Sequence, residues 1–266
     1  MTWGVAGLTV TFGGRVALDG VDLDAVPGEV SAVVGGDGAG KTTLLRVLAG
    51  LPVPHRGRVS TPGRRRIGYV PAAGGVFADL TVAENLEFVG AAHRLPAPLD
   101  AAAPLLERTG LAPFTRRLDA DLSGGMRRKL AVIGAMIHGP DLLILDEPTT
   151  GIDPVSRSDL WRLIASAVSG GAAAVVTSAY LDESERAATV TVLHEGRVVV
   201  AGSAAEVRRS MPGSVVVTDR PGDRSRAWRR GQVWREWHPR GAPGAVEPDL
   251  EDVVIVAALA AEGGGR

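Results

Sequence analysis

The stretch VSAVVGGDGAGKTT, residues 30–43, decides the fold of this chain. Its first part, Val30–Val34, is a short continuous apolar run, which is typical of a strand buried on both faces of a sheet. The remainder fits the pattern G-x-x-x-x-G-K-[ST] and runs into a helical segment, Thr42–Ala49. A strand, a glycine-rich loop and a helix in this order predict a loop that binds the phosphates of a nucleoside triphosphate.

Each residue type in this loop has a physical role toward a triphosphate. Glycines let successive backbone N–H groups point at phosphate oxygens, and the following helix adds its dipole. The ammonium of Lys41 can reach the β- and γ-phosphates, and the hydroxyl of Thr42 can join a Mg²⁺ ion. The alternative, a glycine-rich turn that fits by chance, is disfavoured by the flanking strand and helix. The predicted binding residues are Gly35, Gly36, Asp37, Gly38, Ala39, Gly40, Lys41, Thr42 and Thr43.

A second apolar run, Leu142–Leu145, ends in two acids 105 residues beyond Lys41. Asp146 can hold Mg²⁺ through its water shell. Glu147 can orient or deprotonate the attacking water, which makes it the predicted catalytic residue. The alternative is a strand that ends in a helix cap, with a turn at Pro148.

Length and composition restrict the class of protein. The 266 residues suit one large domain or one domain with a small appendage, and an apolar share of 45% allows a sizeable core. The 29 basic and 30 acidic side chains leave no global positive charge for nucleic acid. Cysteine is absent, which excludes disulfides and thiolate zinc sites. No apolar run approaches the ~20 residues of a spanning helix, so we expect a soluble chain, or one that sits on a membrane through a partner.

Strands and helices alternate along most of the chain. Further strands are predicted at Ala172–Thr177, Val190–Leu193 and Arg197–Val200, and a helix at Asp159–Val168. This alternation predicts an α/β fold with a largely parallel sheet. Residues 78–136 carry a helical pattern without buried-strand runs, which indicates an inserted helical subdomain.

The segment Leu122-Ser123-Gly124-Gly125-Met126 precedes three basic residues and an apolar helix. Ser123 is a predicted N-cap, and the two glycines allow close approach to an anion. The plainer interpretation is a well-capped helix start and nothing more.

With LSGGM between the phosphate loop and LLILDEP, the chain resembles the ATP-binding subunits of ABC transporters over about Val5–Val207. Residues 67–71, 79–86 and 177–185 extend the resemblance, most of all to the ABC-2 type, drug-export-like branch. It implies a P-loop NTPase cassette over residues 1–207, with a RecA-like mostly parallel sheet, a small antiparallel β part and the inserted helices. Residues 208–266 would form a small C-terminal accessory region.

The resemblance also implies a mechanism in which two cassettes sandwich two ATP molecules head to tail. Ser123, Gly124 and Gly125 would contact the ATP that the partner cassette binds. Phe12 matches an aromatic residue that stacks on adenine, although ordinary core packing is nearly as good an explanation. Asp153 matches a loop that crosses the dimer interface, and the N-cap of the following helix is the alternative.

Two positions depart from the family pattern. Ala72 stands where the family carries a glutamine that touches Mg²⁺ and the water, and Ala179 where it carries a histidine that contacts the γ-phosphate. Alanine offers no side-chain hydrogen bond, and losing one positioned transition-state contact costs about 10²–10³ in rate. We therefore expect this chain's own site to bind ATP and Mg²⁺ but to hydrolyse ATP weakly, while its signature completes a partner's site. A slow homodimer is the competing hypothesis.

The resemblance implies two kinds of partner, integral membrane transporter subunits and a second cassette. We expect the assembly to act as an exporter at the cytoplasmic face of the membrane. The alternative is a non-transport ABC-class ATPase that acts on nucleic acid or the ribosome. The short spacing between the two ATP motifs and the absence of cysteine disfavour it, and no nucleic acid is expected. An ordinary P-loop kinase or GTPase is disfavoured by the signature.

Two features stay outside these motifs. Residues 224–240 hold six arginines and three tryptophans. They indicate either a contact with an anionic membrane surface or nucleic acid or, as we favour, a small accessory sheet with solvated arginines and packed tryptophans. A strand at Met211–Asp219 and a helix at Pro248–Ala261 are predicted around it. The chain has only two lysines: Lys41, whose compact ammonium suits the loop, and Lys129, expected at a solvated helix position.

Overall fold

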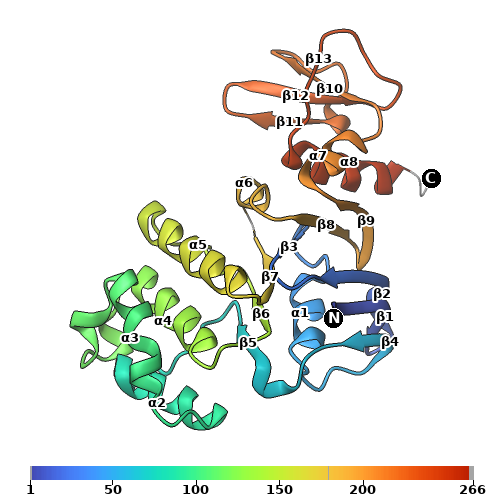
Figure 1. The fold of residues 1–266 in the computed structure, drawn as a ribbon. Helices are drawn as coiled ribbons and strands as arrows, with labels where there is room; N and C mark the ends of the chain where they lie inside the picture. The colour runs from blue at the N-terminus through green and yellow to red at the C-terminus, as the bar shows by residue number, and fades with distance from the viewer. Residues whose placement is uncertain (1, 179, 264–266) are drawn as a thin grey trace.

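The structure is a computed structural model that describes residues 2–178 and 180–263. Its centre is a six-stranded sheet in the order β5-β6-β7-β3-β8-β9, parallel except for β9 (Figure 1). The predicted α/β class with a mostly parallel sheet is confirmed. The strands are β3 (Val30–Val34), β5 (Ile67–Val70), β6 (Leu142–Leu145), β7 (Ala173–Thr177), β8 (Thr189–His194) and β9 (Arg197–Gly202).

A second, antiparallel sheet has the order β2-β1-β4 and contains β1 (Trp3–Phe12), β2 (Arg15–Ala25) and β4 (His55–Ser60). Helix α1 (Lys41–Leu48) packs between this sheet and the central one. Its Leu44 and Leu48 share one buried cluster with Leu18 of β2 and Ile144 of β6. This packing fixes α1, and with it the phosphate loop at its N-terminus.

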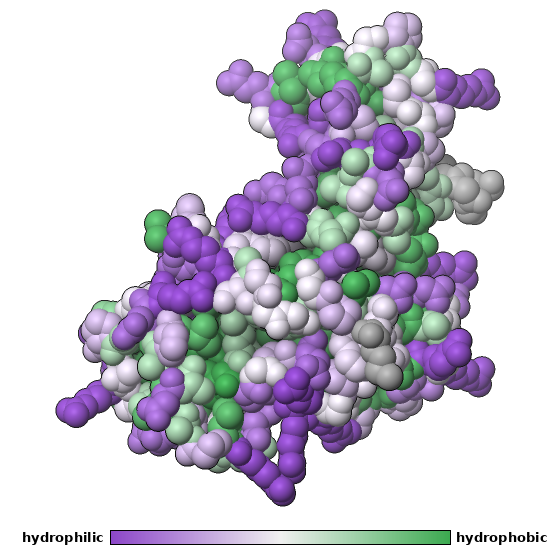
Figure 2. Space-filling model, viewed as in Figure 1, coloured by the Kyte–Doolittle hydropathy of each residue, from purple (hydrophilic) through white to green (hydrophobic). Residues whose placement is uncertain are grey.

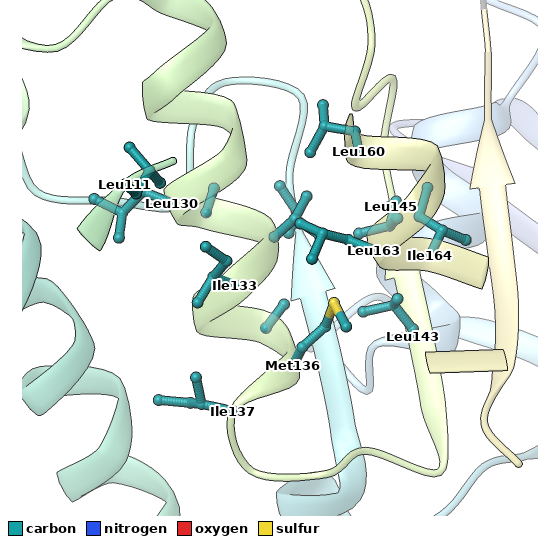
Figure 3. Close-up of a cluster of buried hydrophobic side chains, with 14 of the residues drawn as sticks. Leu111, Leu130, Ile133, Met136, Ile137, Leu143, Leu145, Leu160, Leu163 and Ile164 are labelled. Carbon is teal, nitrogen blue, oxygen red and sulfur yellow. The ribbon is translucent and has the colours of Figure 1, made fainter. Parts of the chain in front are cut away.

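The helical subdomain contains α2 (Val82–His93), α3 (Pro98–Thr109) and α4 (Gly124–Met136), and α5 (Pro154–Ser169) lies beside it (Figure 1). Figure 3 shows how side chains from α4 and α5 meet those of β6 in one core. The capping box of Thr81 and Glu84 starts α2. Helix α5 begins earlier than expected because Asp153 caps it. The labelled core residues are Leu111, Leu130, Ile133, Met136, Ile137, Leu143, Leu145, Leu160, Leu163 and Ile164.

The accessory part is a four-stranded antiparallel sheet in the order β11-β12-β10-β13, followed by a helix. Helix α6 (Leu181–Ser184) lies between β7 and β8 of the cassette, and α7 (Ala204–Arg209) leads from β9 to the accessory part. The accessory elements are β10 (Ser214–Thr218), β11 (Ala227–Arg230), β12 (Val233–His238), β13 (Ala245–Val246) and α8 (Leu250–Gly263). In the described part of the chain, no helix combines the length and apolar character needed to cross a bilayer.

The accessory sheet confirms its prediction except at Arg235. The other five arginines of residues 224–240 are exposed, as expected. Trp237 is buried and donates its Nε1–H to the carbonyl of Pro212 at 2.7 Å, as expected of a packed tryptophan. Arg235, however, is not a solvated arginine. Its Nη1 lies 2.5 Å from Oδ2 of Asp252, a carboxylate that is completely buried at the start of α8.

Lys129 is also placed differently from the prediction. It is buried on α4, where Nζ lies 2.5 Å from Oδ2 of Asp159 on α5 and 3.4 Å from the carbonyl oxygen of Thr109. The helical pattern did not show that α5 covers this side of α4. The second lysine of the chain therefore joins two helices rather than facing water.

Replacing Lys129 with methionine should lower the free energy of unfolding by about 2 kcal/mol, because the largely buried Asp159 loses its closest cation. Urea denaturation measures this change. Arg162 is the matched control, since it pairs with the same carboxylate but is mostly exposed. Arg162→Met should cost less than about 1 kcal/mol, and equal losses for the two variants would contradict the assignment.

Candidate functional site

The phosphate loop, residues 35–40, connects β3 to α1 through two positions that only glycine fits. A Cβ at Gly35 would lie 2.2 Å from the carbonyl oxygen of Leu193, and one at Gly40 would lie 2.8 Å from that of Ala17. Both glycines have positive φ, at 153° and 103°. The sheets on either side therefore hold the loop backbone closely.

The tip of this loop is open to ligands. Gly36, Asp37 and Gly38 are exposed, whereas Ala39 is buried. Because Gly40 caps α1 without a side-chain acceptor, the first amides of the helix have no side-chain partner from their cap. Such an N-terminus favours an anion.

Lys41 is buried at the base of the loop. Its Nζ donates to the carbonyl oxygens of Gly35 at 2.7 Å and Gly36 at 3.1 Å. Two of its three donors are thus held by the loop, and the ammonium stays beside the amides that face an anion. Thr42 and Thr43 follow, half-buried, in the first turn of α1.

Asp146 and Glu147 follow β6 at the same edge of the central sheet. One hydroxyl connects them: Thr177 Oγ1 donates to Oδ1 of Asp146 and accepts from the N–H of Glu147, both at 2.8 Å. The sequence did not reveal Thr177, because its pattern indicates only that this residue ends a strand. The alternative of a simple helix cap after β6 does not describe this arrangement.

The backbone of Glu147 is strained, with a φ of 48° that non-glycine residues rarely adopt. Its half-buried carboxylate accepts a weak hydrogen bond from Thr150 at 3.3 Å. The hydroxyl of Thr177 holds the strained peptide in place. Glu147 is thus held through its backbone, and its carboxylate forms no ion pair within residues 2–178 and 180–263.

The residues present fit a Mg²⁺ ion. Asp146 is almost completely buried, and its Oδ2 has no hydrogen-bond partner within the described chain. Such an orphaned carboxylate oxygen is expected where a cation or its water completes the site. The described residues contain no cluster of three acidic or histidine side chains, so phosphate oxygens would have to supply further ligands.

A buried carboxylate ties together the loops around this edge. Glu183 accepts hydrogen bonds from Thr149 at 2.6 Å and from Ser178 at 2.9 Å, and it lies 3.3 Å from Nε of Arg157 on α5. The loop after Glu147, the segment after β7 and the start of α5 are therefore joined through this carboxylate. Sequence reasoning missed this network, because its members lie up to 34 residues apart.

The structure places the first departure, Ala72, just after β5, where its exposed methyl group offers no polar atom to the site. Its carbonyl accepts a hydrogen bond from Arg128 at 3.1 Å, and the Pro71 carbonyl accepts a second at 3.3 Å. Burial lowers the pKa of Arg128, while Asp146 and Glu147 act to raise it. The second departure, Ala179, lies outside the described residues.

Phe12 does not pack in the core: its side chain is 48% exposed at the end of β1. It lines a cavity of about 940 Å³ that also contains the tip of the phosphate loop. The volume lies within the range of about 300–1,000 Å³ typical of ligand sites. The lining residues are Phe12, Arg15, Val16, Ala17, Gly36, Asp37, Gly38, Ala39, Leu193, His194, Glu195, Val254, Ile255, Ala258 and Leu259.

The signature segment lies on another part of the molecule. Ser123 caps α4 by accepting from the N–H of Met126 at 3.2 Å, and Gly124 is exposed beside it. A Cβ on Gly125 would lie 2.4 Å from Oγ of Ser156, so this glycine lets α4 approach α5. Among the described residues that line the phosphate-loop cavity, none comes from this segment.

Asp153 is exposed at the start of α5 next to the signature. Its Oδ1 accepts from the amides of Val155 at 3.0 Å and Ser156 at 2.9 Å, and the bonds from Ser156 lower the pKa of the carboxyl. The N-cap explanation is therefore correct for this side chain. A role at a dimer interface stays a prediction, which the exposure of Asp153 and Val155 permits.

Residues 18–150 match the family model described as "ABC transporter". The chain belongs to this family. It is 39% identical to the daunorubicin resistance ATP-binding protein DrrA3 of Streptomyces coeruleorubidus over 79% of this chain and 70% of that protein. It is 38% identical to a Nod factor export ATP-binding protein I of Cupriavidus metallidurans, over 77% and 72%.

Solved structures agree with this family. The ATP-binding subunit of an ABC transporter superposes with a TM-score of 0.72 at 27% identity, covering 79% of this chain and 92% of that one. The chain is thus an ABC-class ATPase that binds nucleotide, and the predicted resemblance is confirmed. Members of this family work as dimers with membrane subunits.

Thr177→Val should lower the ATPase rate by about tenfold or more, because Asp146 and Glu147 both lose the hydroxyl that holds them. The affinity for nucleotide should change little, because the phosphate loop makes no hydrogen bond to this hydroxyl in the described residues. Steady-state turnover against MgATP concentration tests this. Thr177→Ser, which keeps the hydroxyl, is the control. Wild-type turnover in Thr177→Val, or an equal loss in Thr177→Ser, would show that the hydroxyl is not what matters.

Proposed function

We propose that this chain is the ATP-binding motor subunit of an ABC-2 type exporter, held at the cytoplasmic face of a membrane by integral membrane subunits. The observation that carries the proposal is the separation of its two ATP motifs. The phosphate loop opens into one cavity, while Ser123 and Gly124 are exposed elsewhere. A signature that does not reach its own loop is what a head-to-tail pair of cassettes requires.

At its own loop the chain binds ATP together with Mg²⁺. The amides of residues 36–40 and the ammonium of Lys41 hold the phosphates, and Phe12 stacks on the base. Thr42 and Asp146 hold the Mg²⁺ ion, which neutralises phosphate charge when bound. Glu147 orients the attacking water and accepts its proton, in a position fixed by Thr177.

Hydrolysis at this site is slow in our proposal. Ala72 brings only a methyl group and a carbonyl to the edge where Asp146 lies, and that carbonyl is already engaged by Arg128. With Ala179 as the second departure, the site would lack both the family's glutamine contact to Mg²⁺ and the water and its histidine contact to the γ-phosphate. Ser123, Gly124 and Gly125 would complete the faster site of a different cassette, with Asp153 at the interface between the two.

The membrane subunit docks, in this proposal, in the groove between α2 and the segment after β5. Phe77 and Phe88 lie there with their ring centroids 4.7 Å apart, and about half of each side chain is exposed. An exposed aromatic pair is costly unless a partner covers it. The groove adjoins the segment that contains Ala72, so docking and the nucleotide site share one loop.

The relatives are named for daunorubicin resistance and Nod factor export, which supports outward transport. The cargo itself is determined by the membrane subunit. The alternative action on nucleic acid or ribosomes has less support, because Arg230 and Arg235 of the basic segment are already paired with acids at the start of α8.

The test is to measure ATPase activity of the purified chain alone and with candidate partner cassettes. We expect slow turnover alone, a strong increase in the mixed assembly, and little further loss when Glu147→Gln is introduced in this chain, because its own site contributes little. A Ser123→Arg variant should abolish the increase, since its signature serves the partner. Rapid turnover of the chain alone that Glu147→Gln abolishes would favour the homodimer and contradict the weak-site proposal.

Replacing Phe88 with aspartate should release the chain from membranes that contain its partner subunits, because the exposed aromatic contact becomes charged. Co-sedimentation with those membranes measures this. Val199→Asp on β9 is the control, as it adds the same charge at an exposed apolar residue outside both the groove and the proposed dimer interface. Equal binding of both variants and the wild type would rule out this groove.

A further inference from the structure

Helix α8 has an unusually apolar composition. Residues 253–260 read VVIVAALA, so it is apolar around its whole circumference. A helix of this kind is stable in a protein when it is covered on all sides. The neighbours of α8 therefore show which of its faces the fold itself covers.

Two faces of α8 are packed inside the molecule. Val253 shares a buried cluster with Val34, the residue of β3 that leads into the phosphate loop. Val256 shares another with Val215 and Trp237 of the accessory sheet. The helix is thus clamped between the central sheet and the accessory sheet.

Charged side chains hold the start of α8 in place. Asp249 and Asp252 each accept the other's amide at 3.0 Å, which caps the first turn. Arg235 of β12 lies 2.5 Å from Asp252 and 3.2 Å from Asp249. The start of α8 is therefore held firmly against the accessory sheet.

The remaining face of α8 carries Val254, Ile255, Ala258 and Leu259, at the spacing of one helical stripe. These half-buried side chains line the same cavity as Phe12 and the tip of the phosphate loop. Figure 2 shows hydrophobic side chains gathered between the accessory region and the cassette, next to the C-terminal end. One cavity thus joins an anion-binding tip to an apolar wall.

We propose that this face of α8 is an apolar wall for the base and ribose of the bound nucleotide, which makes the C-terminal region part of the nucleotide site. The proposal rests on ATP binding at the phosphate loop. Once the phosphates lie on residues 36–39, the uncharged end of the nucleotide extends into the rest of the cavity. A base has two apolar faces, and Phe12 can cover only one of them.

A contact between α8 and the nucleotide would also affect the accessory region. Because α8 is clamped to both sheets, a nucleotide that contacts Ile255 also stabilises the attachment of the accessory sheet to the cassette. The C-terminal region then senses whether the site is occupied.

The test compares binding of the non-hydrolysable analogue AMP-PNP with that of inorganic triphosphate, which lacks base and ribose. Ile255→Ser should raise the dissociation constant of AMP-PNP about tenfold, as expected when one large aliphatic contact is lost. The dissociation constant of triphosphate should stay unchanged. Val217→Ser is the control, because Val217 is an exposed apolar residue of β10 outside the cavity. Calorimetry gives the affinities, and thermal unfolding checks that each variant is folded.

A second measurement needs no substitution. In the wild-type chain, AMP-PNP should slow amide hydrogen exchange in residues 254–259, and triphosphate should not. The proposal is overturned if Ile255→Ser binds AMP-PNP as the wild type does, if it loses triphosphate by the same factor, or if both ligands protect α8 equally. Failure of the wild type to bind either ligand would instead overturn ATP binding itself, and this proposal with it.

Discussion

The parallel register of β3, β6 and β7 is the constraint on which the rest of the structure depends. Val33 pairs with Thr177, and Leu145 pairs with Val176, so the three strands end at the same edge of the sheet. The residues that follow them are the phosphate loop and Asp146. Parallel strands bring together at their carboxyl ends groups that are far apart in the chain, and ligands bind at this edge.

The packing around this edge keeps it rigid. The phosphate loop touches the backbone of β8 so closely that Gly35 has no room for a side chain, and α1 is buried between two sheets. The hydroxyl of Thr177 holds both acidic residues from the neighbouring strand. A site built in this way is preorganised, so that its groups need little rearrangement when a nucleotide binds.

The phosphate loop and the signature segment lie in different surroundings. The tip of the loop lines a cavity together with α8, whereas the signature lies at an exposed helix start beside Asp153. The buried pair of Lys129 and Asp159 holds α4 and α5 together at this surface. In the proposed head-to-tail pair, one chain would offer half of each of two composite sites.

The sequence by itself determined the α/β class, the phosphate loop, the acidic pair and the family, because these depend on short contiguous motifs and on periodicity. It did not show Thr177, Glu183 or the role of Lys129, since each depends on which elements become neighbours. Only the tertiary structure decided that Phe12 lies at a cavity and that α8 lines it. Apolar residues that pack in a core and apolar residues that line a site look alike in a sequence, and only the packing of distant elements separates them.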